Sequence, residues 1–214
     1  MNQITRPLYA DEIRLLTKLK NKIIHKKRTG IGATHIILVL FTGLIFADLA
    51  YVLHTGFMAF VSGTFAVVCF LFVIFGPYEA YKDRRRARKR LRQLNQLLLT
   101  NTLEVTLVHA QQIAVGREFE DEGDLYLIAY GDGDVLYLWD NGHGMKGFPC
   151  LTFEIYKEDY TALVSRQIHV LSPKITPVEI EAEKKWKYLK KYGGPGHLAT
   201  ERVDFDVLLS RFYE

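Results

Sequence analysis

The side chains best suited to catalysis stand close together between residues 140 and 150. Asp140, His143 and Cys150 are the residue types of a Cys/His nucleophilic site, in which a base activates the thiol and a third group orients the base. Glycines separate them, Cys150 follows a proline at an expected strand start, and no flanking pattern of a thiol hydrolase is present. We therefore favour a glycine-rich loop and a small apolar core residue over a membrane-bound hydrolase.

Acidic side chains form a second candidate group. An acidic stretch covers residues 118–124, and Asp132 and Asp134 follow at the tip of an expected hairpin. Carboxylates are good ligands for divalent cations, so a metal could bind if the two groups lie close together. The spacing does not match an EF-hand loop, and the sequence has no Walker loop, CxxC or HExxH motif. We expect solvated turns, no metal and no cofactor.

Asp48 is the one formal charge among residues 31–77. Carboxylates within a membrane are costly and usually face water or a partner. One interpretation is an ion or proton relay, which would need several copies of the chain. The other is a residue near the membrane surface, hydrogen-bonded to His54, Thr55 or a neighbouring subunit.

Two long apolar stretches hold Asp48 and dominate the N-terminal half. Residues 34–53 and 57–77 are each about twenty residues long, enough for a helix to span the roughly 30 Å hydrocarbon layer of a bilayer. Only three residues separate them, so the helices should be antiparallel neighbours. Two buried helices of a soluble bundle are the alternative, but the second stretch has no polar face. The sequence predicts a transmembrane hairpin over residues 31–77.

Small residues recur four apart in both stretches, at Gly43 and Ala47 and at Ala59 and Gly63. Such pairs allow close helix contact, either within the hairpin or between copies in a homo-oligomer. We favour packing within the hairpin.

Basic residues flank the apolar block on both sides. Residues 1–30 and 78–100 each carry eight Lys or Arg and two Asp or Glu. The positive-inside rule therefore places both flanks, and both termini, in the cytoplasm. Anionic lipid headgroups are the expected partner, and nucleic acid is not, because no stacking aromatics accompany the charges. The basic residues nearest the membrane are Lys26, Lys27, Arg28, Arg84, Arg85, Arg86 and Arg88.

The flanks should themselves be helical. Apolar residues at roughly helical spacing predict a basic amphipathic juxtamembrane helix within residues 1–30. After a turn or kink at Gly76-Pro77, residues 78–100 predict a basic helical connector.

The remaining residues, 101–214, are acidic overall and change to the two-residue period of strands. Strands are expected over 103–107, 125–130, 135–139, 151–156 and 168–171, with Asp132-Gly133 turning a hairpin whose strands are buried on both faces. Helices should begin near Thr176-Pro177 and after Asp204. The prediction is a soluble α+β domain: a four- or five-stranded, mainly antiparallel sheet or partly open barrel with C-terminal helices.

The stretch from Glu118 to Ile155, with its EDEG run, GDG turn and FP…FE strand, resembles a segment of small bacterial membrane proteins of unassigned function. The resemblance implies a multi-pass protein of the bacterial inner membrane and no catalytic residue. We expect a non-enzymatic, membrane-tethered interaction or regulatory module with a membrane protein partner. An oligomeric, channel-like two-helix effector is the alternative.

Overall fold

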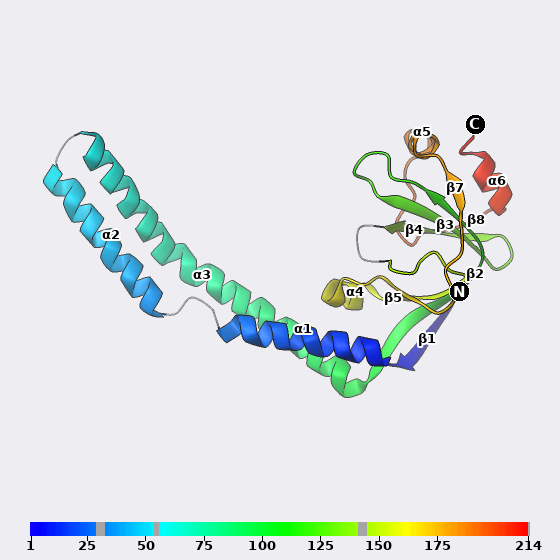
Figure 1. Ribbon diagram of the computed structural model, residues 1–214, viewed down its shortest axis with the longest axis horizontal. Helices are drawn as coiled ribbons and strands as arrows, with labels where there is room; N and C mark the ends of the chain where they lie inside the picture. The colour runs from blue at the N-terminus through cyan, green and yellow to red at the C-terminus, as the bar shows by residue number, and fades with distance from the viewer. Residues whose placement is uncertain (29–32, 54–55, 141–144, 214) are drawn as a thin grey trace. The chain divides into compact units, whose positions relative to one another are not determined.

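The chain forms two compact units. Figure 1 shows the computed structural model, which describes residues 1–28, 33–53, 56–140 and 145–213. One unit combines Met1–Tyr9 with Asn101–Glu214, and the other comprises Ala10–Thr100. We call them the sheet unit and the helical unit. The helical unit is inserted in the chain between the first two strands of the sheet unit.

The sheet unit is α+β and mainly antiparallel. Its strands follow the order β6-β5-β2-β3-β4-β8, with β1 antiparallel and β7 parallel to β2. The described residues form more strands than the four or five expected, because β1 has no alternating apolar pattern and β7 and β8 are only three residues long. The strands are β1 (Asn2–Pro7), β2 (Thr102–Gly116), β3 (Asp124–Tyr130), β4 (Asp134–Asp140), β5 (Thr152–Tyr156), β6 (Ile168–Val170), β7 (Val178–Ile180) and β8 (Thr200–Arg202).

Strand β2 joins two halves of the sheet. Its first half pairs with β1 and β5, and its second half, after a register shift between Ala110 and Gln112, pairs with β3 and β7. One apolar cluster lies between the halves and includes Val108, Ile128 and Phe153. A second cluster lies on the other face of β3 and β4, against α5 (Ala182–Tyr192) and α6 (Phe205–Ser210). The remaining helix, α4, covers Glu158–Val164.

The β3–β4 hairpin confirms two predictions. Asp132 and Gly133 lie in the turn, and residues 125–129 and 135–138 are buried, as expected for strands with apolar side chains on both faces. The positive φ angles fall on Gly131 and Gly133, the residues that tolerate them at no steric cost.

The helix predicted near Thr176-Pro177 begins later than expected. Val178–Ile180 form β7, paired with Ala114–Gly116, and α5 starts at Ala182. Sheet pairing thus overrides the local capping signal. The final helix confirms its predicted cap, because the Asp204 carboxylate accepts hydrogen bonds from the backbone N–H groups of Asp206 and Val207 at 3.0 and 3.1 Å.

The described residues of the helical unit form α1 (Ala10–Arg28), α2 (Ala33–Leu53) and α3 (Phe57–Thr100). Among the described residues, α2 and α3 contain stretches long and apolar enough to cross a membrane. We predicted a turn or kink at Gly76-Pro77, and the turn is wrong, since α3 continues through Pro77. The prediction also missed β1, because Asn2–Pro7 were assigned to the amphipathic segment and instead pair with β2.

Close packing joins α2 to α3 at Gly43. A Cβ atom on Gly43 would lie 2.9 Å from the Cβ of Cys69, closer than side chains tolerate. Gly63 is less confined, with its nearest neighbour, the Cβ of Ala50, at 4.0 Å from the same position. The Phe46 and Phe65 rings stack nearby at 5.5 Å. At Gly43, contact within the hairpin therefore requires a residue without a side chain.

Candidate functional site

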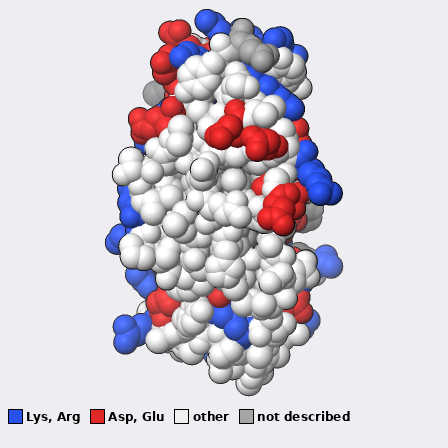
Figure 2. Space-filling model, turned by 90° about the vertical axis from the view of Figure 1, so that its right-hand side faces the viewer, with Lys and Arg blue, Asp and Glu red and all other residues white. Residues whose placement is uncertain are grey.

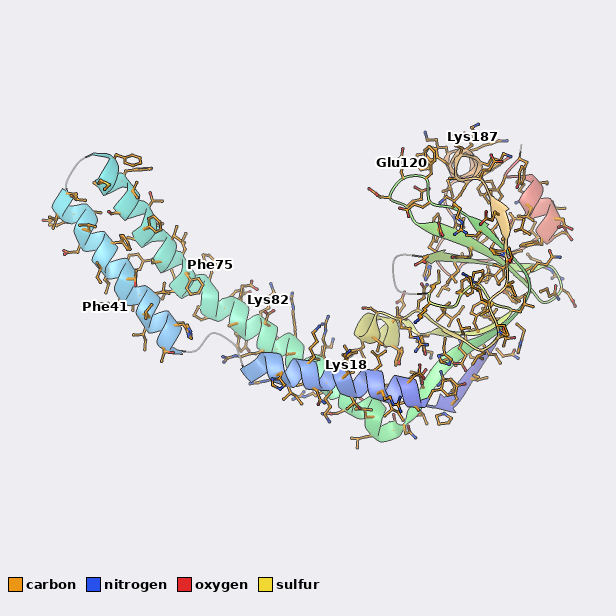
Figure 3. All side chains as sticks on the ribbon, viewed as in Figure 1. Lys18, Phe41, Phe75, Lys82, Glu120 and Lys187 are labelled. Atoms are coloured by element: carbon orange, nitrogen blue, oxygen red, sulfur yellow. The ribbon has the colours of Figure 1, made fainter. Side chains whose placement is uncertain are left out.

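A groove lies along α3 in the helical unit. It encloses a cavity of about 850 Å³, with Ile23 of α1 at its side. Its α3 lining spans Val68 to Arg90, the part of the helix where apolar residues give way to basic ones. Figure 3 marks Phe75 in the apolar part and Lys82 in the basic part.

Small residues line the groove and leave its space open. Gly76, Ala80 and Ala87 line it, and their spacing of four and seven residues keeps them on one face of α3. Phe72 and Phe75 line the groove beside Gly76. Bulky neighbours flanking a small-residue face leave room for an elongated apolar group.

The other end of the groove is charged. Arg84, Arg86 and Arg90 line it together with Glu79 and Asp83, so guanidinium groups outnumber carboxylates. Arg86 and Asp83 are 4.0 Å apart with both side chains about two-thirds exposed. An exposed ion pair of this kind contributes about 0–1 kcal/mol, so an incoming anion can replace the carboxylate.

The structure separates the basic residues singled out from the sequence. Arg84 and Arg86 line the groove, whereas Arg85 and Arg88 are exposed on α3 and do not line it. Arg90 also lines the groove. The side chains of Lys26, Lys27 and Arg28 lie outside the described residues.

Asp48 lies apart from the groove. Its side chain is exposed on the surface of α2. His54 and Thr55, its expected hydrogen-bond partners, lie outside the described residues.

The thiol site is unfavourable for catalysis. Cys150 is fully buried, and its thiol donates a hydrogen bond to the Thr152 carbonyl at 3.3 Å. Burial raises the thiol pKa, so the nucleophilic thiolate is disfavoured. Asp140 ends β4, and His143 lies outside the described residues.

The two acidic groups do not meet. Asp124 pairs with Asp140 at one end of the β3–β4 hairpin, while Asp134 pairs with Tyr130 at the other. Seven-residue strands put these ends roughly 20 Å apart, so the acidic stretch cannot share a cation with Asp132 and Asp134. Within the described ranges no cluster of three or more His, Cys, Asp or Glu could hold a metal.

A buried ionic cluster at β1 was missed from the sequence. The Arg6 Nε donates to both carboxylate oxygens of Glu154 on β5 at 2.8 Å, and both side chains are almost fully buried. The Arg6 guanidinium also lies 3.7 Å from the centre of the Tyr9 ring, which stacks on His169 at 4.7 Å. No local sequence pattern predicts this contact, because Arg6 and Glu154 are 148 residues apart.

A second buried charge, Lys185, links α5 to the loop before β3. Lys185 is fully buried, donates to the Gly123 carbonyl at 2.8 Å and pairs with Glu122 at 3.0 Å. Partial burial would raise the Glu122 pKa, but the bond from Lys185 and a backbone bond outweigh it and lower that pKa. The other lysines of α5 are at least partly exposed.

Surface charge gives no support to a nucleic-acid interface on the face seen in Figure 2. Among the described residues visible there, Lys and Arg form separate groups, mostly along the edges, and much of the middle is uncharged. A nucleic-acid interface needs a continuous basic surface.

No protein-family model, curated protein or solved structure matches this chain. The comparisons therefore supply no functional residue, and the site must be judged on its geometry.

Proposed function

We propose that this protein is a membrane-tethered, non-enzymatic interaction or regulatory module. In this proposal α2 and the first part of α3 cross a membrane as a hairpin, both termini are cytoplasmic, and the sheet unit meets a membrane protein partner. The resemblance noted in the sequence suggests the inner membrane of a bacterium.

The observation that carries the proposal is the exposure of the apolar helices. In the apolar 18-residue windows of α2 and α3, only 6% and 11% of residues are buried within the chain. Core helices of soluble proteins are mostly buried, whereas here large side chains such as Phe41, Phe60 and Phe75 are more than half exposed. Apolar surface of this extent requires lipid or protein around it.

Topology argues against a removable leader. Asn2–Pro7 precede the first apolar helix and pair with Thr102–Leu107 of β2. Cleavage after the first apolar helix would remove this strand from the sheet unit. An uncleaved hairpin keeps both strands in one chain, joined at both ends to the sheet unit.

Tethering suits an interaction module, because it confines the sheet unit near the membrane and raises its effective concentration for a membrane partner. The buried, high-pKa Cys150 gives no support to the hydrolase alternative.

The oligomeric effector is the second candidate, and the exposed position of Asp48 favours it. A carboxylate on the outer surface of a membrane hairpin would be stabilised by a neighbouring subunit or by water.

Extraction and crosslinking test the two candidates. After expression of the full chain, we expect it to resist alkaline carbonate extraction and to crosslink to a different membrane protein. Release into the carbonate supernatant would overturn the tether. Crosslinking only to itself, with ion leakage that Asp48→Asn abolishes, would favour the effector.

A further inference from the structure

We propose that the groove along α3 is a binding site for one anionic phospholipid. An acyl chain lies along the apolar part, and the phosphate lies between Arg84, Arg86 and Arg90. The inference rests on the proposed membrane insertion of α3 and adds to it a discrete ligand with a defined position.

The apolar part has the form that a lipid chain needs. Val68, Leu71, Phe72 and Phe75 line it, and all four lie within about two helical turns, roughly 10 Å along the helix. Gly76 continues this face without a side chain. A chain seated there would cover the exposed Phe72 and Phe75 rings, which are 40% and 59% accessible.

The basic part provides for the phosphate. Guanidinium groups bind phosphate oxygens in a bidentate manner and retain their charge at any physiological pH. Arg84 and Arg90 are six residues apart, about 9 Å along the helix, with Ala87 between them in the lining. The small Ala87 leaves space for a headgroup between the two arginines.

The order of the two parts matches the order of a phospholipid in the inner leaflet. From Val68 toward Arg90 the chain runs from the apolar stretch to the basic flank, as lipid tail is followed by phosphate. A helix from a second copy would fill the apolar part equally well, but the excess of guanidinium groups favours an anionic occupant. A second copy remains one outcome of the test.

The chain provides matched variants. Arg84→Gln with Arg90→Gln removes two charges from the groove, whereas Arg85→Gln with Arg88→Gln removes two charges from the same helix outside it. Ala87→Phe fills the floor without changing charge. The full-length protein, purified in mild detergent, is titrated with phosphatidylglycerol or phosphatidylcholine and the bound lipids are counted by native mass spectrometry.

We expect one tightly bound phosphatidylglycerol per chain and no tight phosphatidylcholine. The groove double variant should weaken binding about 25-fold, since each Arg near an anionic surface contributes a factor of about five. Ala87→Phe should weaken it similarly, and the control pair should bind as wild type. Free inorganic phosphate at equal concentration should not compete; competition would show a phosphate site without a lipid chain.

Three results would overturn the site. Equal losses of lipid affinity in both double variants would show that lipid binds a diffuse basic surface. Equal binding of phosphatidylglycerol and phosphatidylcholine would show that the arginines do not recognise an anionic headgroup. A dimer that excludes lipid would show that a second copy occupies the groove. Carbonate extraction of the same variants keeps the two proposals apart. A protein that stays in the membrane yet binds no lipid in the groove contradicts only the site, whereas a protein released by carbonate contradicts the tether.

Discussion

Replacing Arg6 with methionine should loosen the N-terminal strand. Arg6 donates from Nε to both oxygens of Glu154, and its Nη1 donates to the Pro7 carbonyl at 2.9 Å. Methionine retains an unbranched apolar side chain and removes every one of these donors. Glu154 would remain, 1% exposed, with the Tyr9 hydroxyl at 3.3 Å as a remaining donor.

The loss of stability follows from the Glu154 carboxylate, which stays buried without Arg6. Removing one partner of a buried ion pair destabilises a protein by about 3–5 kcal/mol, because the other charge stays buried without compensation. For a unit of this size, that loss corresponds to a fall in Tm of roughly 10 °C or more. Replacing both partners, Arg6→Met with Glu154→Leu, should recover most of the lost stability, because no unpaired charge then stays buried.

The assay is urea unfolding of the full-length protein in mild detergent, with hydrogen exchange read at Asn2–Pro7. We expect the single variant to lose stability and the β1 amides to exchange faster than those of β3. Lys157→Met is the control, because Lys157 pairs with Glu104 on the surface and both side chains are more than half exposed. If Arg6→Met costs no more than this control, or if the double variant is less stable than the single one, the reasoning is wrong.

Three further predictions concern helix packing, pH and the thiol. Gly43→Val should destabilise the helical unit by about 1–3 kcal/mol through overpacking against Cys69, whereas Gly63→Val should be nearly neutral, as measured by thermal unfolding in detergent. Lys185→Met should destabilise the sheet unit at neutral pH. Because pairing lowers the Glu122 pKa, that difference should shrink as the pH falls below the ordinary value of 4.5, and a pH-independent difference in urea unfolding would contradict the pairing. In a Cys69→Ser background, Cys150 should react with maleimide only after unfolding; rapid labelling of the native protein would reopen the hydrolase interpretation.

The spacing of apolar residues correctly predicted those helices and strands whose structure depends on their own side chains. The apolar runs of α2 and α3 and the strands flanking Asp132-Gly133 are long and unambiguous, so their type follows from the sequence. The Asp204 cap is equally local, because the carboxylate bonds to amides two and three residues further on.

The strands that the sequence analysis missed form by pairing with a strand that is distant in the sequence. Asn2–Pro7 carry no strand pattern, and β1 forms because β2 offers an edge to it. Val178–Ile180 follow a helix-capping signal but pair with Ala114–Gly116 instead. Sequence alone cannot show that two segments a hundred residues apart are neighbours.

The groove combines both kinds of information. The basic run and the apolar run were evident from the sequence, but the division of the arginines was not. Arg84, Arg86 and Arg90 line the groove while Arg85 and Arg88 do not.

The most direct test of the account is the sidedness of the hairpin turn. In a Cys69→Ser background, Gly56→Cys lies in the turn between α2 and α3, and Ser210→Cys lies at the end of α6. Intact cells are treated with a membrane-impermeant maleimide before and after permeabilisation. The account predicts labelling of Gly56→Cys from outside and of Ser210→Cys only after permeabilisation; labelling of both positions from the same side would contradict it.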